Sequence, residues 1–339
     1  WNKETSSIKK YFLKEKDIVI GMDGSKVGKN KAIIKNENLP LIIAQRVACL
    51  RAENNLNQSF LYYLIFSKRF YRYVELIKTG TSIPHISSRQ IELFKIPIPP
   101  LPEQSAIAKI LSDLDSKIEL NQRMSENLEE IGLALFNKWS NIDEIPENWE
   151  IKPLDEIAEY LNGLALQKYP AEEGEDYLPV IKIRELRNGI TEQTDKASLE
   201  LPEEYIIEDG DVLFSWSGTL EVEIWTNGQG ALNQHLFKVS SKEFPKWFYY
   251  YWTKHHLPRF RHIAKGKATT MGHIQRHNLK ESEVIIPDKK SLENMGKVMF
   301  PIIERIIDLR LEARNLSKIR DSLLPRLMSG KIRVPVEVN

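Results

Sequence analysis

One stretch decides the fold because it occurs twice, as Gly80–Ile86 (GTSIPHI) and as Ala268–Ile274 (ATTMGHI), 188 residues apart. The same offset, without a gap, places Ile96–Pro99 on Val284–Pro287 and then one long helical pattern on another. The sequence therefore predicts two half-proteins in tandem, each ending in a Thr-containing loop, a Pro-closed strand and a long heptad helix. A duplicated chain folds most simply about a pseudo-two-fold axis, which suits a target that is itself two-fold, such as a DNA duplex.

Length and composition set the domain count and exclude several classes of protein. A chain of 339 residues with 42% hydrophobic residues can form two globular cores plus connecting helices. The single cysteine, Cys49, excludes a disulfide scaffold and a Cys-x-x-Cys zinc site, and we expect it to be buried. No apolar stretch approaches the roughly 20 residues that span a bilayer, and no signal peptide precedes the first domain, so we expect a cytoplasmic protein. Trp1 is not a natural start, and the first copy lacks a counterpart to most of residues 149–196, so we expect the chain to begin inside its first domain.

Charge is segregated along the chain, although its formal net value is only +1. Residues 1–100 carry 17 Lys and Arg against 8 Asp and Glu, and residues 238–280 carry 10 against 1 with five histidines added. The acids lie elsewhere, with 19 against 6 basic residues in 149–237 and 10 against 4 in 101–148. Basic regions at equivalent places in a repeat suit two phosphate-contacting surfaces, because each neutralised phosphate releases counterions. A solvated basic face is the alternative for either region alone.

Short strands and aromatic helices are predicted in each copy. In the second copy, three apolar runs lie between Gly-Asp, Asn-Gly and Gln-Gly turn signals: Val180–Ile183, Asp211–Phe214 and Leu236–Val239. The first copy has three matching runs: Asp17–Ile20, Lys31–Ile34 and Gln45–Ala48. The aromatic runs Phe60–Tyr73 and Trp247–Phe260 predict helices whose rings belong to the core. Only their interleaved basic residues are candidates for phosphate contact: Lys68, Arg69, Arg72, Arg259 and Arg261.

Two heptad patterns predict a long helix after each domain. In the first helix we place these residues at a positions: Ile107, Leu114, Asn121, Leu128 and Leu135. The d positions are then Ile110, Lys117, Met124, Ile131 and Lys138. In the second helix the a positions are Met295, Ile302, Leu309, Leu316 and Leu323, with Val298 and Ile319 at d and Met299 and Ile306 beside the seam. These heptad residues are the candidates for coiled-coil contact and for partner docking.

The ends and the pairing of these helices can also be predicted. The first helix is expected at Glu103–Lys138, directly after Pro102, with a length of about 54 Å at 1.5 Å per residue. Pro301 either kinks the second helix or marks its true start. Asn121 would fix the register of the pair, or its position is due to chance. Antiparallel pairing would make a rigid rod with a domain at each end, and such a rod would act as a ruler between two DNA-facing domains.

Three features together resemble the specificity subunit of type I restriction-modification systems. They are the order of the parts, the element Pro99–Gln104 (PPLPEQ) and the ending Leu323–Ile332 (LLPRLMSGKI). The resemblance covers essentially the whole chain and implies an α+β or mixed fold. This fold has two α/β target-recognition domains in a pseudo-two-fold tandem repeat, separated by two long antiparallel coiled-coil helices. We expect the domains at residues 1–100, truncated at the N-terminus, and 141–288, with the helices at 101–140 and 289–339.

The resemblance also implies a function and partners. The family is known for a bipartite DNA site with an unspecified spacer, so one domain would bind each half-site. Two methyltransferase subunits would dock on the helices and carry S-adenosylmethionine, and restriction or translocase subunits could join. The expected location is the cytoplasm of a bacterium or archaeon. A coiled-coil scaffold whose domains bind protein, and an autonomous DNA-binding regulator, remain as alternatives.

The chain itself lacks the motifs that methyl transfer or cleavage would need. Amino-methylating enzymes hold the target amine in Asn/Asp-Pro-Pro-Tyr/Phe, and the nearest match, Ile98–Leu101 (IPPL), has no polar donor. Gly24–Asn30 (GSKVGKN) departs from a phosphate loop in its spacing and lacks the Ser/Thr that would hold magnesium, so it predicts a Gly-rich hairpin. His255, His256 and His262 match no zinc spacing and suit solvated surface. We therefore expect no catalytic residue, metal or cofactor on this chain.

Candidate DNA-contacting residues are polar groups at corresponding turns of the two copies. Asn and Gln can bond adenine bidentately and Arg can do so to guanine, although each could instead stabilise a turn. Hydroxyls and lysines of the Thr-containing loops suit phosphates better than bases. The candidates in the first copy are Asp23, Ser25, Lys26, Lys29, Gln45, Arg46, Lys78, Thr81, Ser82 and His85. Those in the second copy are Ser215, Trp216, Ser217, Gln229, Asn233, Gln234, His235, Lys265, Lys267, Thr269, Thr270, His273 and Arg276.

Overall fold

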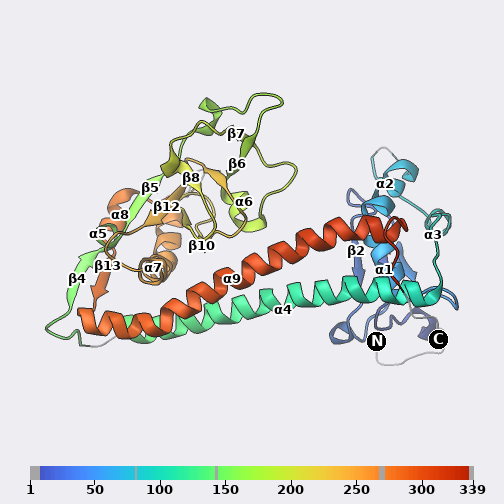
Figure 1. Ribbon diagram of the computed structural model, residues 1–339, viewed down its shortest axis with the longest axis horizontal. Coiled ribbons are helices and arrows are strands. Elements are labelled where there is room, and N and C mark those ends of the chain that lie inside the picture. The colour runs from blue at the N-terminus through green and yellow to red at the C-terminus, as the bar shows by residue number, and fades with distance from the viewer. Residues whose placement is uncertain (1–7, 81, 142–143, 267–271, 336–339) are drawn as a thin grey trace. The chain divides into compact units, whose positions relative to one another are not determined.

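The computed structural model describes residues 8–80, 82–141, 144–266 and 272–335, and it divides into two compact units. The first unit comprises Trp1–Ile118 with Asn315–Asn339, and the second comprises Glu119–Arg314. Two 40-residue helices, α4 (Leu101–Ser140) and α9 (Lys289–Met328), contribute to both units (Figure 1). The expected class, two mixed α/β domains in tandem with two long helices, is confirmed. No helix within the described ranges is long and apolar enough to cross a bilayer.

The first unit is built on an antiparallel sheet with the strand order β2-β1-β3. Alternate residues of a strand face the same side, so Ile18 and Ile20 are both fully buried and share a core cluster with Phe70 and Val74. The strands are β1 (Ile18–Gly21), β2 (Lys31–Ile33) and β3 (Val47–Leu50), with 3-10 turns at Lys9–Tyr11 and Asn36–Asn38.

Two helices, α1 (Gln58–Phe66) and α2 (Lys68–Ile77), replace the single helix that we expected over Phe60–Tyr73. The break falls at Ser67, whose backbone is extended and whose hydroxyl accepts a hydrogen bond from the Phe70 amide at 3.3 Å. A serine that satisfies a free amide in this way starts a new helix. The short helix α3 (Ser88–Glu92) starts similarly, with a capping box between Ser87 and Gln90.

The second unit contains three sheets, in the orders β10-β9-β12-β5, β7-β6-β11-β8 and β13-β4. The strands are β4 (Glu150–Pro153), β5 (Glu159–Asn162), β6 (Tyr177–Ile181), β7 (Lys196–Ser198), β8 (Ile206–Ile207), β9 (Val212–Ser215), β10 (Val222–Ile224), β11 (Gly230–Leu232), β12 (Leu236–Ser240) and β13 (Glu283–Ile286). The helices are α5 (Leu154–Ile157), α6 (Ile183–Asn188), α7 (Lys246–Gly266) and α8 (Arg276–Lys280), with 3-10 turns at Leu166–Lys168 and Glu203–Tyr205. As predicted, the aromatic helix α7 belongs to the core, because its rings from Trp247 to Trp252 are buried.

The repeat is visible in the strand registers. β1 pairs with β2 and β3 as β9 pairs with β10 and β12, so Ile18 lies opposite Ile33 as Val212 lies opposite Ile224. The counterpart of β2 is therefore β10, which the sequence did not indicate. Of the predicted run Val180–Ile183, the first two residues are the last two of β6, and Ile183 starts α6. The sheet that contains β6 has no equivalent among the described residues of the first unit.

The Pro-closed strand forms in only one copy. Residues Glu283–Ile286 pair with β4 as β13, whereas Ile96–Pro99 form no strand, so that prediction was wrong for the first copy. The physical reason is that Ile96–Pro99 have no strand to pair with, because no strand equivalent to β4 occurs among the described residues of the first unit. Buried Gln104 holds this segment instead, since its Nε2 donates to Pro99 O at 2.8 Å and its Oε1 accepts from the Asn57 amide at 2.8 Å.

α4 and α9 pack antiparallel within each unit. In the second unit Phe136 shares a core cluster with Met299 and Ile303, and in the first unit Leu111 shares one with Leu327. α9 begins at Lys289 and runs through Pro301, so Pro301 is not its true start.

Burial along α4 locates the packed rows of the seam. The residues placed at a are buried or half-buried, but the row placed at d is not the second packed row, because Ile110 and Ile131 are 36% and 50% exposed. The second packed row lies one residue further on: Gln104, Leu111, Ile118, Ser125 and Gly132 are all buried. α9 shows the same shift, with Met299 and Ile306 buried and Val298 and Ile319 exposed. Asn121 is fully buried, and its side-chain amide has no hydrogen-bond partner in the described part of the chain.

Candidate nucleic-acid interface

The last residues of the two Thr-containing loops, 84–86 and 272–274, are joined to the ends of equivalent strands by the same backbone bonds. In the first unit the Gly24 amide donates to Pro84 O at 3.0 Å, and the Ile86 amide donates to Met22 O at 2.8 Å. In the second unit the Gly218 amide donates to Gly272 O at 2.8 Å, and the Ile274 amide donates to Trp216 O at 3.0 Å. Isolated bridges join Asp23 to His85 and Ser217 to His273 in the same way. The repeated sequence therefore forms the same site twice, once after β1 and once after β9, and we call each of these a strand-end site.

In the second unit this site gathers four of the predicted side chains. The Trp216 ring lies 5.9 Å from the His235 ring and 6.4 Å from the His273 ring, and Ser217 Oγ lies 3.1 Å from His235 Nδ1. Trp216 Nε1 also donates to Asn162 Oδ1 at 2.9 Å. Stacking rings beside hydroxyl and imidazole groups can contact bases or sugars, and the bond to Asn162 fixes the orientation of the indole.

Arg276 lies beside this group, at the start of α8. Its guanidinium donates to Tyr160 O at 3.1 Å and stacks over the Phe237 ring with 5.6 Å to the centroid. The side chain is exposed despite both contacts, so its charge remains accessible to a phosphate or a base.

The first unit places a smaller polar group at the equivalent site. Exposed Arg46 donates to Asp23 Oδ2 at 2.8 Å from a backbone with φ of 60°, and exposed Gln45 precedes it. His85 Nε2 lies 3.1 Å from Thr79 Oγ1. Lys78 pairs with Glu75 at 2.7 Å, and Ser82 is exposed. This site therefore combines one guanidinium, one amide and one imidazole at the end of β1.

Several predicted phosphate contacts lie near these sites. Lys265 lines a cavity of about 310 Å³ with Arg261 and Thr219, and its ammonium is exposed. Ser25 and Lys26 are exposed on the Gly-rich turn after β1, whereas Lys29 lies over the Tyr71 ring at 5.0 Å. The predicted contacts outside the described residues are Thr81, Lys267, Thr269 and Thr270.

Four other predicted residues are engaged within the fold. The Ser215 hydroxyl is buried, donates to Thr219 O at 2.6 Å and accepts from the Glu221 amide at 2.8 Å, which favours turn stabilisation. The Asn233 side chain is buried and accepts from the His235 backbone amide, and the backbone amide of half-buried Gln234 donates to Leu164 O. Gln229 donates to Glu208 Oε1 at 3.1 Å. The side-chain contacts of Ser215, Asn233 and Gln229 are of a kind that stabilises the fold locally, and a DNA contact by any of the four residues stays a prediction.

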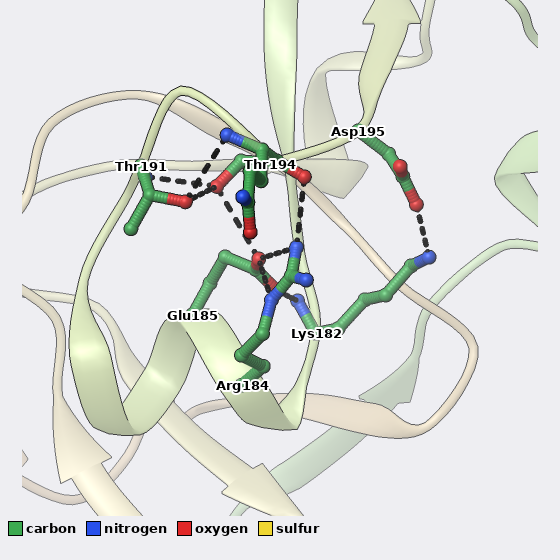
Figure 2. A network of polar contacts seen from close by, with 7 residues as sticks. Lys182, Arg184, Glu185, Thr191, Thr194 and Asp195 are labelled. Carbon is green, nitrogen blue, oxygen red and sulfur yellow. Dashed lines mark hydrogen bonds and ion pairs between the residues drawn. The ribbon is translucent and has the colours of Figure 1, made fainter. Parts of the chain in front are cut away.

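The charges between β6 and β7 are neutralised locally, as Figure 2 shows. Lys182 pairs with Asp195, and Arg184 Nε donates at 2.8 Å to Glu185, whose side chain is 1% exposed. Thr194 Oγ1 donates to the same carboxylate at 3.3 Å and accepts from the Thr191 amide at 2.9 Å. This network fixes the α6–β7 connection and leaves little positive charge there for phosphates.

Of the three histidines of α7 that we expected on the solvated surface, His262 is exposed, but His255 and His256 are not. His255 and His256 are half-buried against Trp252, and burial lowers the pKa of both, that of His256 to about 4. His256 Nε2 lies 2.9 Å from Glu283 O. Within the described ranges no group of three His, Cys, Asp or Glu side chains could hold a metal ion.

A buried ionic network in the second unit joins the mixed domain to both long helices. Glu129 of α4 accepts from Arg310 of α9 at 2.8 Å and pairs with Lys254 of α7, and the Tyr250 hydroxyl donates to it at 2.5 Å. Burial alone would raise the pKa of Glu129, but Lys254 and Arg310 hold it below its usual value. Burial raises the pKa of Glu223, which lies 3.6 Å from Arg310. The network orients the strand-end site relative to the helix pair of its own unit.

The first unit has an analogous anchor. Tyr63 of α1 donates to Asp115 of α4 at 2.7 Å, and Arg320 of α9 donates to the same carboxylate at 2.8 Å. Near the start of α4, buried Glu103 accepts two bonds of 2.6 Å from Arg333. Each unit thus fixes its mixed domain on its helices with a carboxylate from α4, a tyrosine and an arginine. Sequence reasoning missed these groups, and Asn162 and Thr79 as well.

Comparison with known proteins agrees with this architecture. The family model of the type I restriction modification DNA specificity domain matches residues 2–130 and 146–320. The chain is 26% identical over 327 residues to the type I restriction enzyme MjaIX specificity subunit of Methanocaldococcus jannaschii, covering 89% of this chain and 75% of that protein. It is 30% identical over 235 residues to the EcoKI specificity subunit of Escherichia coli, covering 62% and 49%.

A solved structure shares the fold. The S subunit of a type I restriction-modification system from M. genitalium aligns with a TM-score of 0.61 at 19% identity, covering 94% of this chain and 84% of that one. The fold and the repeated strand-end sites define a tandem protein of two mixed α/β domains on two long helices. The chain belongs to the specificity subunits of type I restriction-modification systems, which confirms the resemblance seen in the sequence.

Proposed function

We propose that this specificity subunit binds a bipartite DNA site with one domain per half-site and docks methyltransferase subunits on α4 and α9. The observation that carries the first part is the repeated strand-end site. Two loops at an offset of 188 residues are bonded to equivalent strands through the same amides and carbonyls, and both lie in basic regions of the sequence. A protein with two such sites fits a target with two half-sites.

The residues around each site differ, which suits two different half-sites. Trp216, His235 and His273 form an aromatic group in the second unit, whereas the first unit presents Arg46 and Gln45. Hydrogen bonds to base edges carry sequence information, whereas phosphate contacts fix the register of the protein on the duplex. The two units would therefore recognise different bases through one shared backbone frame.

Exposed apolar residues on the long helices support the second part of the proposal. The row of α4 that we had placed in the seam is largely exposed and carries Ile110 and Ile131, and α9 exposes Val298, Phe300 and Ile319 to between 45% and 57%. Exposed apolar side chains at helical spacing suit a protein partner. Methyl transfer would then take place on the partner, which would carry S-adenosylmethionine.

Exchange of one domain tests the half-site assignment. Residues 149–287 are replaced by the equivalent domain of a relative with a different motif, and the methylated motif is determined by sequencing the modified bases of the host. We expect one half of the motif to change and the other half to stay. Exchange of residues 8–97 is the matched control and should change the opposite half. Alteration of both halves by a single exchange would refute the assignment.

Salt titration separates this function from that of a protein-binding scaffold. A specificity subunit that contacts phosphates should lose DNA affinity linearly with salt on logarithmic axes, at about 0.9 per contact. A scaffold whose basic regions are incidental would show no defined slope. Copurification with a methyltransferase subunit separates the proposal from an autonomous regulator.

A further inference from the structure

The strand registers align the two strand-end sites residue by residue. The end of β1 lies opposite the start of β3, and the end of β9 lies opposite the start of β12. Asp23 and Ser217 are the second residues after β1 and β9, and Arg46 and His235 directly precede β3 and β12. Asp23 is therefore equivalent to Ser217, and Arg46 is equivalent to His235.

In both units these equivalent residues bond to each other. Arg46 Nη1 donates to Asp23 Oδ2 at 2.8 Å, and Ser217 Oγ lies 3.1 Å from His235 Nδ1. A backbone bond beside each pair is also shared, because Arg46 O and His235 O accept from the first amides after β1 and β9, at 2.8 and 3.4 Å. Each pair thus joins the same two strand ends, although one pair is ionic and the other consists of a hydroxyl and an imidazole.

The residues of the two sites divide into a shared set and a set that differs. The shared positions hold Gly24 and Gly218, Gln45 and Gln234, and His85 and His273. The positions that differ hold Met22 and Trp216, Asp23 and Ser217, and Arg46 and His235. Phosphates are the same in every DNA sequence, whereas base edges are not. The positions that differ are therefore the candidates for base recognition.

The Arg46 side chain has the chemistry and the free donors to bind guanine. A guanidinium can donate two hydrogen bonds to O6 and N7 of guanine in the major groove. Among the described residues this side chain bonds only to Asp23, through Nη1, so its Nε and Nη2 stay available. It is 72% exposed, and its backbone has a φ of 60°, which is uncommon for a residue with a side chain. The Asp23 carboxylate thus orients an accessible guanidinium without occupying all of its donors.

We propose that these equivalent pairs determine the base sequence of each half-site, and that Arg46 binds a guanine in the half-site of the first unit. The inference rests on the proposed function, because it assigns a base to a site that would contact DNA. Asp23 is a positioning residue, since it holds the guanidinium and would not touch the base. In the second unit Ser217 orients His235 instead, so the same position of the fold would select a different base.

Substitution of single guanines by 7-deazaguanine tests the contact. The methylated motif of the host defines the half-sites, and the exchange of residues 8–97 identifies the one that the first unit binds. Duplexes with this motif carry the analogue, which lacks N7 but pairs normally, at one guanine of that half-site at a time. We expect one position where the analogue weakens binding of the wild-type chain about tenfold and leaves binding of Arg46→Ala unchanged. Arg89→Ala, at an exposed arginine of α3, is the matched control and should respond like the wild type.

Transfer of the pair tests the assignment in the second unit. The double variant Ser217→Asp/His235→Arg places the ionic pair at the equivalent positions there. We expect one position of the second half-site to become guanine in the methylated motif, while the first half-site stays the same. In the first unit Asp23→Ala should lower the preference for guanine, and Asp23→Asn, whose amide oxygen can still accept from Arg46, should restore part of it.

Folding and labelling are controlled for each sample. Ser217 is buried, so the double variant is used only if its thermal transition matches that of the wild type, and exposed Arg46 tests the proposal without it. The chain is used as purified from its host, with any subunit that copurifies, and the fluorophore is placed on the DNA. Cys49, the only cysteine, is unsuitable for a label because it lines the same groove as Arg46, where it is half-buried and not enclosed as we expected.

Three results would overturn the proposal. They are a first half-site without guanine, an equal response of wild type and Arg46→Ala to the analogue at every guanine, and an Arg46→Ala variant that weakens binding to all duplexes alike. In the last case the slope of log affinity against log salt concentration should fall by about 0.9, and Arg46 would contact a phosphate. A wild-type chain that binds no duplex and directs no methylation would refute the proposed function itself. A normal motif without any dependence on Arg46 would refute this inference alone.

Discussion

Replacement of Glu129 by Gln should destabilise the second unit more than any other single charge removal on α4. The carboxylate contacts Arg310 and Lys254, and all three side chains are only 18% to 20% exposed. The change keeps the shape of the side chain but leaves two buried cations without their main counter-charge. Loss of one partner of a buried ion pair costs about 3 to 5 kcal/mol.

The lower end of that range applies here, because Glu223 still lies 3.6 Å from Arg310 in the variant. The second unit spans Glu119–Arg314, and for a domain of that size each kcal/mol shifts the melting temperature by about 2 to 4 °C. A loss of about 3 kcal/mol therefore predicts a decrease of about 6 to 12 °C.

Tryptophan fluorescence during thermal unfolding is the assay, since six of the seven tryptophans lie between Glu119 and Arg314. Glu126→Gln is the matched control, because Glu126 is exposed on the same helix one turn earlier. It should change stability by less than about 0.5 kcal/mol. Equal melting temperatures for the two variants would refute the assignment of Glu129 as the anchor.

The effect of Glu129→Gln should also depend on pH. Lys254 and Arg310 hold the pKa of Glu129 below its usual value of 4.5 despite its burial. A carboxyl whose pKa is lowered by folding stabilises the folded state above its unfolded pKa, and this contribution is lost as pH falls through the folded pKa. The difference between wild type and variant should be complete near neutral pH and shrink below about pH 4.5. Glu223 acts in the opposite sense, because burial raises its pKa.

Two further predictions concern DNA. Replacing Lys265 and Lys267 by Ala should weaken binding to all sequences and lower the slope of log affinity against log salt concentration by about one to two units. Lys297→Ala on α9, the control, should leave this slope unchanged. An unchanged slope in the double variant would exclude the loop from the interface. Inserting one heptad after Leu128 and one after Leu316 keeps the seam in phase and adds about 10 Å at 1.5 Å per residue. The half-site motifs should survive in the methylome, and the gap between them should lengthen by about three base pairs at 3.4 Å each. A variant that folds, binds DNA and keeps the original spacing would show that the helices do not set the distance.

The repeat could be predicted because its elements act locally. The loop around His85 and the loop around His273 carry the same hydrogen-bonding positions, so their sequences stay alike at a constant offset. The capping boxes of α3 and α8, at Ser87 and Gln275, keep that offset too. Local rules also explain why the aromatic run of α7 is buried, since the rings from Trp247 to Trp252 surround the helix on all sides and a helix that is apolar all round is buried.

The second packed row of α4 could not be chosen from the sequence. Ile110 and Leu111 are adjacent and equally apolar, so the heptad pattern fits either of them. What decides is tertiary contact, because Leu111 shares a core with Phe60 of α1 and Met328 of α9, while Ile110 remains 36% exposed. The same limit hid the anchor at Glu129, since its partners lie 121 to 181 residues away in the chain.

The first unit is assembled from two distant parts of the chain, and this has a consequence for biosynthesis. Its core joins Phe60 and Leu111 to Leu327 and Met328, whereas the second unit is continuous from Glu119 to Arg314. At about 5 to 20 residues per second, a ribosome needs roughly 10 to 40 s to travel from the end of the first part to Met328. During that interval the apolar residues of α1 cannot yet pack against the last turns of α9, because those turns have not been synthesised. The unit that is translated first is therefore the last to be completed, and a stalled or clipped nascent chain would release a folded second unit beside an unfinished first one.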